Sequence, residues 1–333
     1  MRKLYSLERV SWLSVLILAI VVPPILGGYL TSILILICIW SMMCISLNLI
    51  YGYTGQLSLG HSAFLALGAY SFGLVAVKLH IGFWPAFLAA AVITGLFGFL
   101  IGIPALKLRG HFFVLVTLGF AVTIGVIVLA WVDFTGGANG LAGIPRPDPI
   151  PLPWGVKFRF DSLLHMYYFV LLFLILTAGF CHRLVSSLLG KTFIAICHDE
   201  NLTESLGVNT MSRKLLSFTI SAMLAGVAGA LYASYNAVIS PEIAHFTRGT
   251  DVLAYLIVGG SATMTGPIVG TFVLVAIPEV LQVVPYLKTL INGVILMLFI
   301  VFLPSGIIGG FKTILPKLGG LRGRPRAGEH DIA

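Results

Sequence analysis

Charged residues are scarce in this 333-residue chain. Only 10% of the residues are Asp, Glu, Lys or Arg, whereas 58% are hydrophobic, and the mean hydropathy is +1.04. One water-soluble core cannot bury so large an apolar fraction, which indicates an integral membrane protein. Its apolar stretches are continuous runs that lack the alternating pattern of a β-barrel, so we expect an all-α polytopic membrane protein.

The motifs of metalloenzymes and hydrolases are also missing: the chain contains no HExxH, CxxC or GxSxG. Its four cysteines have no paired spacing, which argues against a disulfide framework or a metal site. Gly190-Lys191-Thr192 resembles the end of a phosphate-binding loop, but that motif needs glycine at position 185, which is Val185. We therefore expect no enzyme activity, no metal, no cofactor and no ATP site in this chain itself.

Apolar runs near the length of a bilayer span recur along the sequence. A spanning helix takes about 20 residues, and eight runs approach this length: Val10–Ile25, Thr31–Ile50, Ala63–Val77, Phe83–Leu106, Phe112–Val132, Leu163–Cys181, Leu215–Tyr235 and Leu287–Leu303. No small-residue cleavage site follows the first run, so we interpret it as a retained helix. Half-membrane segments raise the expected total to about 8–10 helices in one transmembrane domain, residues 1–333.

Basic residues predict the orientation of these spans, because short loops rich in Lys and Arg stay in the cytoplasm. Fourteen of the 20 basic residues lie in four places: 1–9, 107–109, 183–214 and 312–326. We therefore predict cytoplasmic N- and C-termini, a cytoplasmic loop at 182–214, a cytoplasmic tail at 311–333 and an exterior loop at 133–162. The net charge of +8 reflects this topology, and no basic stripe with interleaved aromatics predicts nucleic-acid binding.

Two clusters of glycine and small polar residues interrupt apolar segments, TGQLSLG at 54–60 and GGSATMTG at 259–266. The span count requires 251–284 to make no net crossing, so we predict a hairpin or a pair of half-helices that turns at Gly259–Pro267. The clusters predict two inverted halves with breaks that line a pathway. Its predicted residues are Thr54, Gly55, Gln56, Ser58, Gly60, His61, Gly259, Gly260, Ser261 and Thr263. The alternative is a simple turn at the first cluster and a close helix contact at the second.

Few ionisable residues interrupt the spans. Asp251 and Glu279 are the acidic exceptions, and we interpret both as solvated positions near segment ends. In the loop at 182–214, Asp199 can cap a short helix that Gly207 ends. A short helix there could dock into a soluble partner, or it could be a connector. The following span carries Ala222, Gly226 and Ala230 at the spacing of close helix packing.

Four motifs together resemble one family. They are GYTGQLSLGHSAFLALGAY, TGGANGLAGIP, ENLTESLGVNTMSRKLLSFTISAMLAGVAGALYA and GGSATMTGPIVGTF, and they occur in this order between residues 30 and 305. In these motifs the chain is similar to LivM-type permease subunits of branched-chain amino acid ABC importers. Importers of urea, short-chain amides and aromatic acids are similar in the same motifs, so the substrate stays open.

The resemblance implies a subunit of the bacterial inner membrane. It pairs with a LivH-like permease, sits on two ATP-binding cassette subunits and receives substrate from a periplasmic binding protein, which the loop Asp133–Ser162 could meet. Glu204, Ser205, Leu206 and Gly207 match the permease coupling motif, although they read ESLG where many permeases have EAA followed by glycine. The competing hypothesis is a stand-alone channel or a secondary transporter, which would often place a coupling carboxylate in mid-span.

Overall fold

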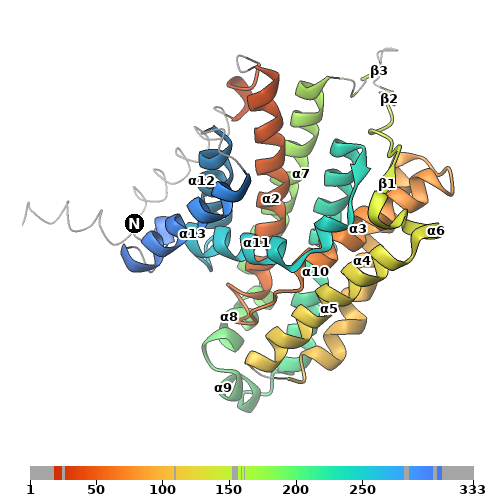
Figure 1. Ribbon diagram of the computed structural model, residues 1–333. Helices are drawn as coiled ribbons and strands as arrows, with labels where there is room; N and C mark the ends of the chain where they lie inside the picture. The colour runs from red at the N-terminus through yellow and green to blue at the C-terminus, as the bar shows by residue number, and fades with distance from the viewer. Residues whose placement is uncertain are drawn as a thin grey trace, which may run out of the picture.

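A bundle of helices forms the protein in a computed structural model that describes residues 19–24, 27–108, 110–151, 157–158, 160, 162–280, 285–302 and 306–309. Figure 1 shows the arrangement. The longer helices are α2 (Gly28–Ile50), α3 (His61–Val77), α4 (Phe83–Ala105), α5 (His111–Ala130), α7 (Leu163–Ser186), α8 (Leu188–His198), α10 (Thr210–Asn236), α11 (Phe246–Gly259), α12 (Gly266–Val280) and α13 (Pro285–Phe302). Short elements are α6 (Val132–Thr135), η1 (Gly137–Asn139), α9 (Glu200–Ser205), η2 (Pro241–Ala244), β1 (Leu141–Ala142), β2 (Ile150–Pro151), β3 (Lys157–Phe158) and β4 (Val238–Ile239).

Five helices of the described residues are long and apolar enough to cross a membrane, namely α2, α4, α5, α7 and α10. Helices can cross lipid because every backbone N–H and C=O is paired within the segment. The predicted all-α polytopic fold is confirmed, and seven of the eight predicted runs coincide with α2, α3, α4, α5, α7, α10 and α13. Most of Val10–Ile25, the residues 1–9 and the predicted tail at 311–333 lie outside the described residues.

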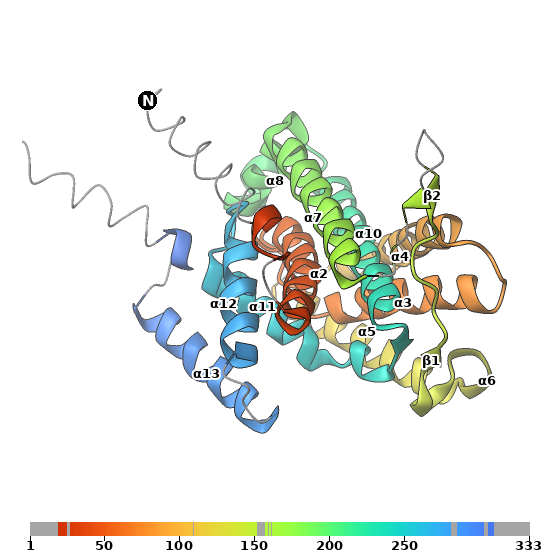
Figure 2. The same ribbon diagram turned by 90° about the horizontal axis from the view of Figure 1, so that it is seen from above.

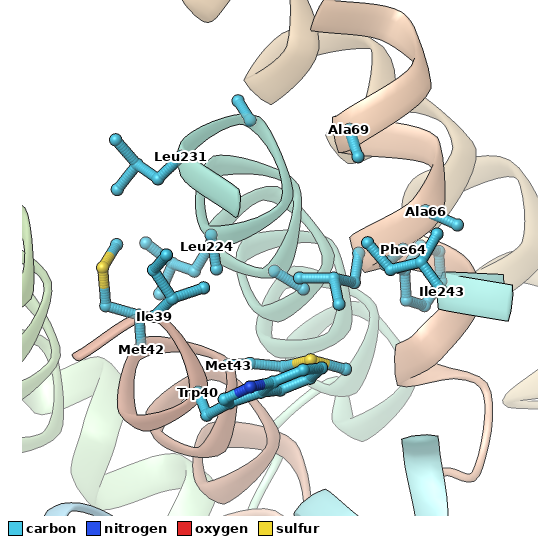
Figure 3. Packing of buried hydrophobic residues seen from close by; sticks show 14 of the residues in the cluster. Ile39, Trp40, Met42, Met43, Phe64, Ala66, Ala69, Leu224, Leu231 and Ile243 are labelled. Atoms are coloured by element: carbon cyan, nitrogen blue, oxygen red, sulfur yellow. The ribbon is translucent and has the colours of Figure 1, made fainter. Parts of the chain in front are cut away.

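Helix α10 lies at the centre of the bundle, between α2, α3 and α4 (Figure 2). Its small residues allow the backbones to approach closely, because a Cβ on Gly68 of α3 would collide with the backbone of Gly226. The small-residue packing predicted for this span is confirmed. Around it, α2 and α3 contribute large buried side chains that fill the remaining space (Figure 3), among them Ile39, Met42, Met43 and Phe64.

Helices α11 and α12 form the predicted hairpin. Asn48, near the end of α2, bonds the turn between them, donating from Nδ2 to the Thr263 carbonyl over 2.7 Å. At the opposite end of α2, the Tyr29 hydroxyl donates to the carbonyl of Glu279 over 3.1 Å. Residues 237–280 therefore enter the bundle and return to the same side, as the span count requires.

The sequence predicted that TGQLSLG and GGSATMTG are corresponding breaks in two halves of the chain. The order of helices indicates another correspondence. After α2 come a non-helical segment at 51–60 and then α3, and after α10 come the segment 237–245 and then α11. The counterpart of TGQLSLG by order is therefore 237–245. GGSATMTG joins α11 to α12, as residues 78–82 join α3 to α4. Sequence composition misled here because the segment at 237–245 contains no glycine.

The loop expected at 133–162 is partly folded against the bundle. Its TGGANG residues span the end of α6 and η1, and positive φ angles at Gly136, Gly137 and Gly140 permit this compact turn. Strand β1 then pairs antiparallel with β4, with Leu141 opposite Ile239. Residues 152–156, 159 and 161 of this loop lie outside the described residues.

Candidate functional site

The first glycine-rich break lies at the end of the bundle that carries α8 and α9, here called the α9 end (Figure 1). Thr54 Oγ1 donates to the Leu49 carbonyl over 2.9 Å and lies 3.0 Å from Ser217 Oγ of α10. Ser217 Oγ also donates to the Leu49 carbonyl. The hydroxyls of Thr54 and Ser217 and the carbonyl of Leu49 thus form a buried contact that joins the end of α2, the break and α10.

A second buried contact lies where α3 begins. His61 Nε2 is 2.8 Å from Ser221 Oγ of α10, and Ser221 Oγ donates to the Ser46 carbonyl of α2. All three residues are fully buried. Because Ser217 and Ser221 are one turn apart on α10, they form a polar stripe that holds the broken segment between α2 and α3.

The second glycine-rich cluster meets the first through Asn48, which is also buried. Its Oδ1 accepts from the Ala262 backbone N–H over 2.9 Å, while its Nδ2 donates to the Thr263 carbonyl. A Cβ on Gly52 would lie 2.6 Å from the Ala262 nitrogen, so the two breaks touch at their backbones. The non-helical segment at 51–60, which contains the first cluster, therefore touches the second cluster at Gly52.

The predicted pathway residues differ in exposure. Thr54, Ser58, Gly60, His61, Gly259 and Gly260 are buried, Gln56 and Thr263 are half-buried, and Gly55 and Ser261 are exposed. The buried side chains of Thr54 and His61 make the interhelical contacts described above. Asn48, Ser217 and Ser221 were not expected in the site, because single polar residues inside apolar runs carry no spacing signal. That these residues line a pathway stays a prediction.

The short helix predicted near Gly207 is confirmed as α9. Asp199 Oδ1 accepts from the Leu202 N–H over 3.0 Å and caps its start. Gly207, at φ +83°, accepts the left-handed conformation that ends it, and its N–H donates to the Glu204 carbonyl. The side chains of Glu204, Ser205 and Leu206 are exposed, and Leu206 retains 77% of its accessible surface.

One ion pair ties α9 to the bundle. Lys214 Nζ, in the first turns of α10, lies 2.6 Å from Glu200 Oε1, and the lysine side chain is only 4% exposed. Glu200 is also the first residue of α9, where a negative charge favours the helix. The exposed residues of α9 are therefore held in a defined position relative to α10.

Helix α8 lies between α7 and α9 and contains Gly190-Lys191-Thr192. These residues are helical, with Ser187 Oγ capping the helix at the Gly190 N–H, so no phosphate-binding loop forms there. Near the other end of α8, desolvation by burial raises the pKa of the Cys197 thiol, although the residue as a whole is exposed. A Cβ on Gly55 would lie 3.2 Å from Cys197 Sγ, so α8 rests against the first break.

In the part of the chain that the structure describes, His, Cys, Asp and Glu side chains form no group of three that could hold a metal ion. The site consists of non-helical backbone, hydroxyl groups and amides inside a helical bundle, together with an exposed helix at one end. These features fit a membrane permease, in which polar, non-helical segments join apolar spanning helices.

Comparison with known proteins identifies the family. Residues 29–303 match the family described as branched-chain amino acid transport system / permease component. The chain is 30% identical over 318 residues to the high-affinity branched-chain amino acid transport system permease protein LivM of Escherichia coli and to LivM of Salmonella typhimurium, covering 90% of this chain and 75% of each relative. It is 25% identical over 286 residues to LivH of Escherichia coli, covering 81% of this chain and 91% of LivH. No solved structure matches the chain.

The protein therefore belongs to the branched-chain amino acid transport permease family, and its resemblance to the LivM type is confirmed. It is a multi-pass membrane transport protein and not an enzyme. Its similarity to LivH as well as LivM is consistent with a paralogous permease as its partner.

Proposed function

We propose that this chain is one of two permease subunits in an ATP-driven importer for branched-chain amino acids. Its partners are a LivH-like permease, two ATP-binding cassette subunits and a periplasmic binding protein. ATP binds only to the cassette subunits, and this chain needs no cofactor. The importer resides in a bacterial inner membrane, with both termini of this chain and the α9 end in the cytoplasm.

The exposed α9, held to α10 by an ion pair with the buried Lys214, carries this proposal. A chain that does not itself bind ATP needs a rigid part through which closure of the ATPases changes the tilt of its helices. Glu204, Ser205, Leu206 and Gly207 form the docking surface for an ATPase. Lys214 and Glu200 transmit the movement to α10, whose polar stripe holds the break at 51–60.

The two breaks supply the pathway in this proposal. Backbone dipoles at non-helical segments can meet the charged groups of an amino acid without adding a fixed charge. In the conformation described, Thr54, Ser58 and His61 are buried and Gly55 and Ser261 are exposed. A tilt of α10 would break the contacts of Thr54 and His61 with Ser217 and Ser221. It would thereby expose Thr54, Ser58 and His61 to the pathway.

Reconstitution tests the proposal directly. The complete complex in liposomes is expected to accumulate leucine only with ATP, with the binding protein on the outside and with cassette subunits that hydrolyse ATP. Cassette subunits whose ATP site has been inactivated are the control. Leucine movement through this chain alone would support a channel or secondary transporter, and transport of urea or an aromatic acid in place of leucine would support another importer.

A further inference from the structure

Helix α11 has two unlike faces. Gly249, Val252 and Leu256 are buried on the side that packs into the bundle. On the other side Thr247, Arg248 and Thr250 are exposed and Asp251 is half-buried. The structure thus places a cation and a carboxylate, three residues apart on a helix, on a face that the described part of the chain does not cover.

This polar face lies at the depth of the membrane centre. Figure 1 shows α11 lying across α2 instead of running along it. Arg248 Cζ is 6.0 Å from the centre of the Trp40 ring, and Trp40 lies at the middle of the 23-residue span α2. The neighbouring Val252 carbonyl accepts from Cys44 Sγ of the same span. Asp251 is therefore inside a helix at mid-depth, and not at a segment end as its sequence position indicated.

Lipid is an unfavourable environment for this face. Charged side chains at the bilayer centre are costly, and they are found facing a bundle interior or a water-filled cavity. In the described residues, no carboxylate lies within ion-pair distance of Arg248. The guanidinium of Arg248 lies against the face of the Trp40 ring, and its charge also acts on Asp251 of the same helix. Within the described residues its side-chain N–H groups make no hydrogen bond, so they are available to a ligand.

We propose that the exposed face of α11 lines the aqueous pathway of the importer, and that Arg248 binds the carboxylate of the amino acid while Asp251 binds its ammonium group. This inference rests on the proposed function and names the substrate class of its pathway. Residues three apart on a helix have Cβ atoms about 5–6 Å apart, so both side chains can reach one small zwitterion. A guanidinium can hold a carboxylate through two parallel hydrogen bonds. Urea and amides lack both charges and would gain neither contact.

Cysteine labelling tests the aqueous face. In the complete complex carrying Cys197→Ala, Thr247→Cys and Thr250→Cys are expected to react with a membrane-impermeant cationic thiol reagent. Leu96→Cys, at the exposed apolar centre of α4, is the control and should stay unreactive. The contradictory result is a Thr250→Cys that reacts no faster than Leu96→Cys in every transport state. Lipid or the partner permease would then cover α11, and the pathway assignment would be overturned.

Substrate protection and uptake test the two charged contacts. Saturating leucine should slow labelling of Thr250→Cys several-fold, whereas leucinamide, which lacks the carboxylate, should protect less. Arg248→Gln should lower leucine uptake about ten-fold or more, since a charged hydrogen bond contributes that much, while Arg248→Lys retains part of it. Lys107→Gln, which neutralises an exposed cation remote from α11, is the matched control and should leave uptake unchanged.

These measurements separate the two proposals. If the wild-type complex imports no leucine, the proposed function fails, and labelling of α11 still decides whether this face is aqueous. Equal protection by leucine and leucinamide, or no protection by either, overturns the role of Arg248. Normal uptake by Arg248→Gln in a complex that imports leucine overturns that role while leaving the importer function intact.

Discussion

Lys214 Nζ lies 2.6 Å from Glu200 Oε1, which joins the first turns of α10 to the first residue of α9. The lysine side chain is only 4% exposed, so replacing Glu200 leaves its charge buried without compensation, at a cost of about 3 kcal/mol. We expect Glu200→Gln to lower leucine uptake per ATP hydrolysed while the complex still assembles. The measurement is the ratio of uptake to ATPase rate in liposomes.

A charge exchange is the sharper form of this test. Glu200→Lys combined with Lys214→Glu should recover part of the coupling that each single variant loses. The control Arg213→Gln neutralises the neighbouring basic residue, which is half-buried. Single variants that couple as well as wild type would show that the pair does not transmit movement.

Gly207 ends α9 at φ +83°, a conformation that glycine accepts without strain. A Cβ there would meet nothing within 4 Å, so backbone strain alone decides the effect of a substitution. Gly207→Asn should be nearly silent, and Gly207→Val should cost about 1–2 kcal/mol and weaken coupling. Gly207→Pro cannot adopt this φ, so it should uncouple hydrolysis from uptake while membrane insertion persists.

Reversal of charge on α9 tests its docking to an ATPase. Glu204→Arg should also uncouple hydrolysis from uptake, because Glu204 is exposed on the proposed docking surface. Co-purification of the cassette subunits gives a second readout. Wild-type coupling in both Gly207→Pro and Glu204→Arg would refute the assignment of α9.

Close contact between α3 and α10 depends on glycine. A Cβ on Gly229 would collide with the Leu65 carbonyl, as one on Gly68 would with Gly226. Gly229→Ala should therefore destabilise the bundle by about 2 kcal/mol, the cost of overpacking. Thermal unfolding in detergent measures this as a lower Tm. Gly179→Ala, where a Cβ meets nothing within 4 Å, is the control and should not lower it.

The Asn48 side chain, near the end of α2, hydrogen-bonds two backbone groups of the turn between α11 and α12. They are the Ala262 N–H and the Thr263 carbonyl. Asn48→Leu removes both hydrogen bonds, and loss of the partner of the half-buried Thr263 carbonyl costs about 1–3 kcal/mol. We expect faster proteolysis of the turn between α11 and α12 than in wild type. Asn139→Leu, in an exposed position of η1, should leave the turn as protected as before.

Exposure predicts which pathway positions react first. With Cys197→Ala as background, Ser261→Cys should react readily with a small polar thiol reagent, because Ser261 is exposed. Ser58 is fully buried, so Ser58→Cys should react only when ATP drives the transport cycle. Inertness of both cysteines in every state would remove these residues from the proposed pathway.

Much of the fold was predictable because lipid imposes it. Seven apolar runs correspond to helices, since a segment in hydrocarbon must pair its own backbone groups. The α9 helix was predictable from Asp199 and Gly207, whose capping and left-handed conformations are local properties. The α11–α12 hairpin followed from counting spans against the basic loops.

Contacts between remote segments were not predictable in this way. Nothing local to His61 indicates that Ser221 will lie beside it, or that Asn48 will bond the turn at Ala262. The compact turn at TGGANG also depends on a remote contact, because the pairing of β1 with β4 holds the loop against the bundle. Such contacts depend on how whole helices pack, which one residue's neighbours in sequence do not specify.

The sequence by itself determined that this chain enters a membrane, which segments are helical there, and where a short helix leaves the bundle. Those properties follow from hydropathy and from the local geometry of Gly and Asp. Only the tertiary structure decided that the two breaks meet at Asn48, that Lys214 holds Glu200, and that Arg248 lies opposite Trp40 at the centre of α2. These relationships arise from close packing of small residues along α10, which sets the helices at distances and rotations that no single segment encodes.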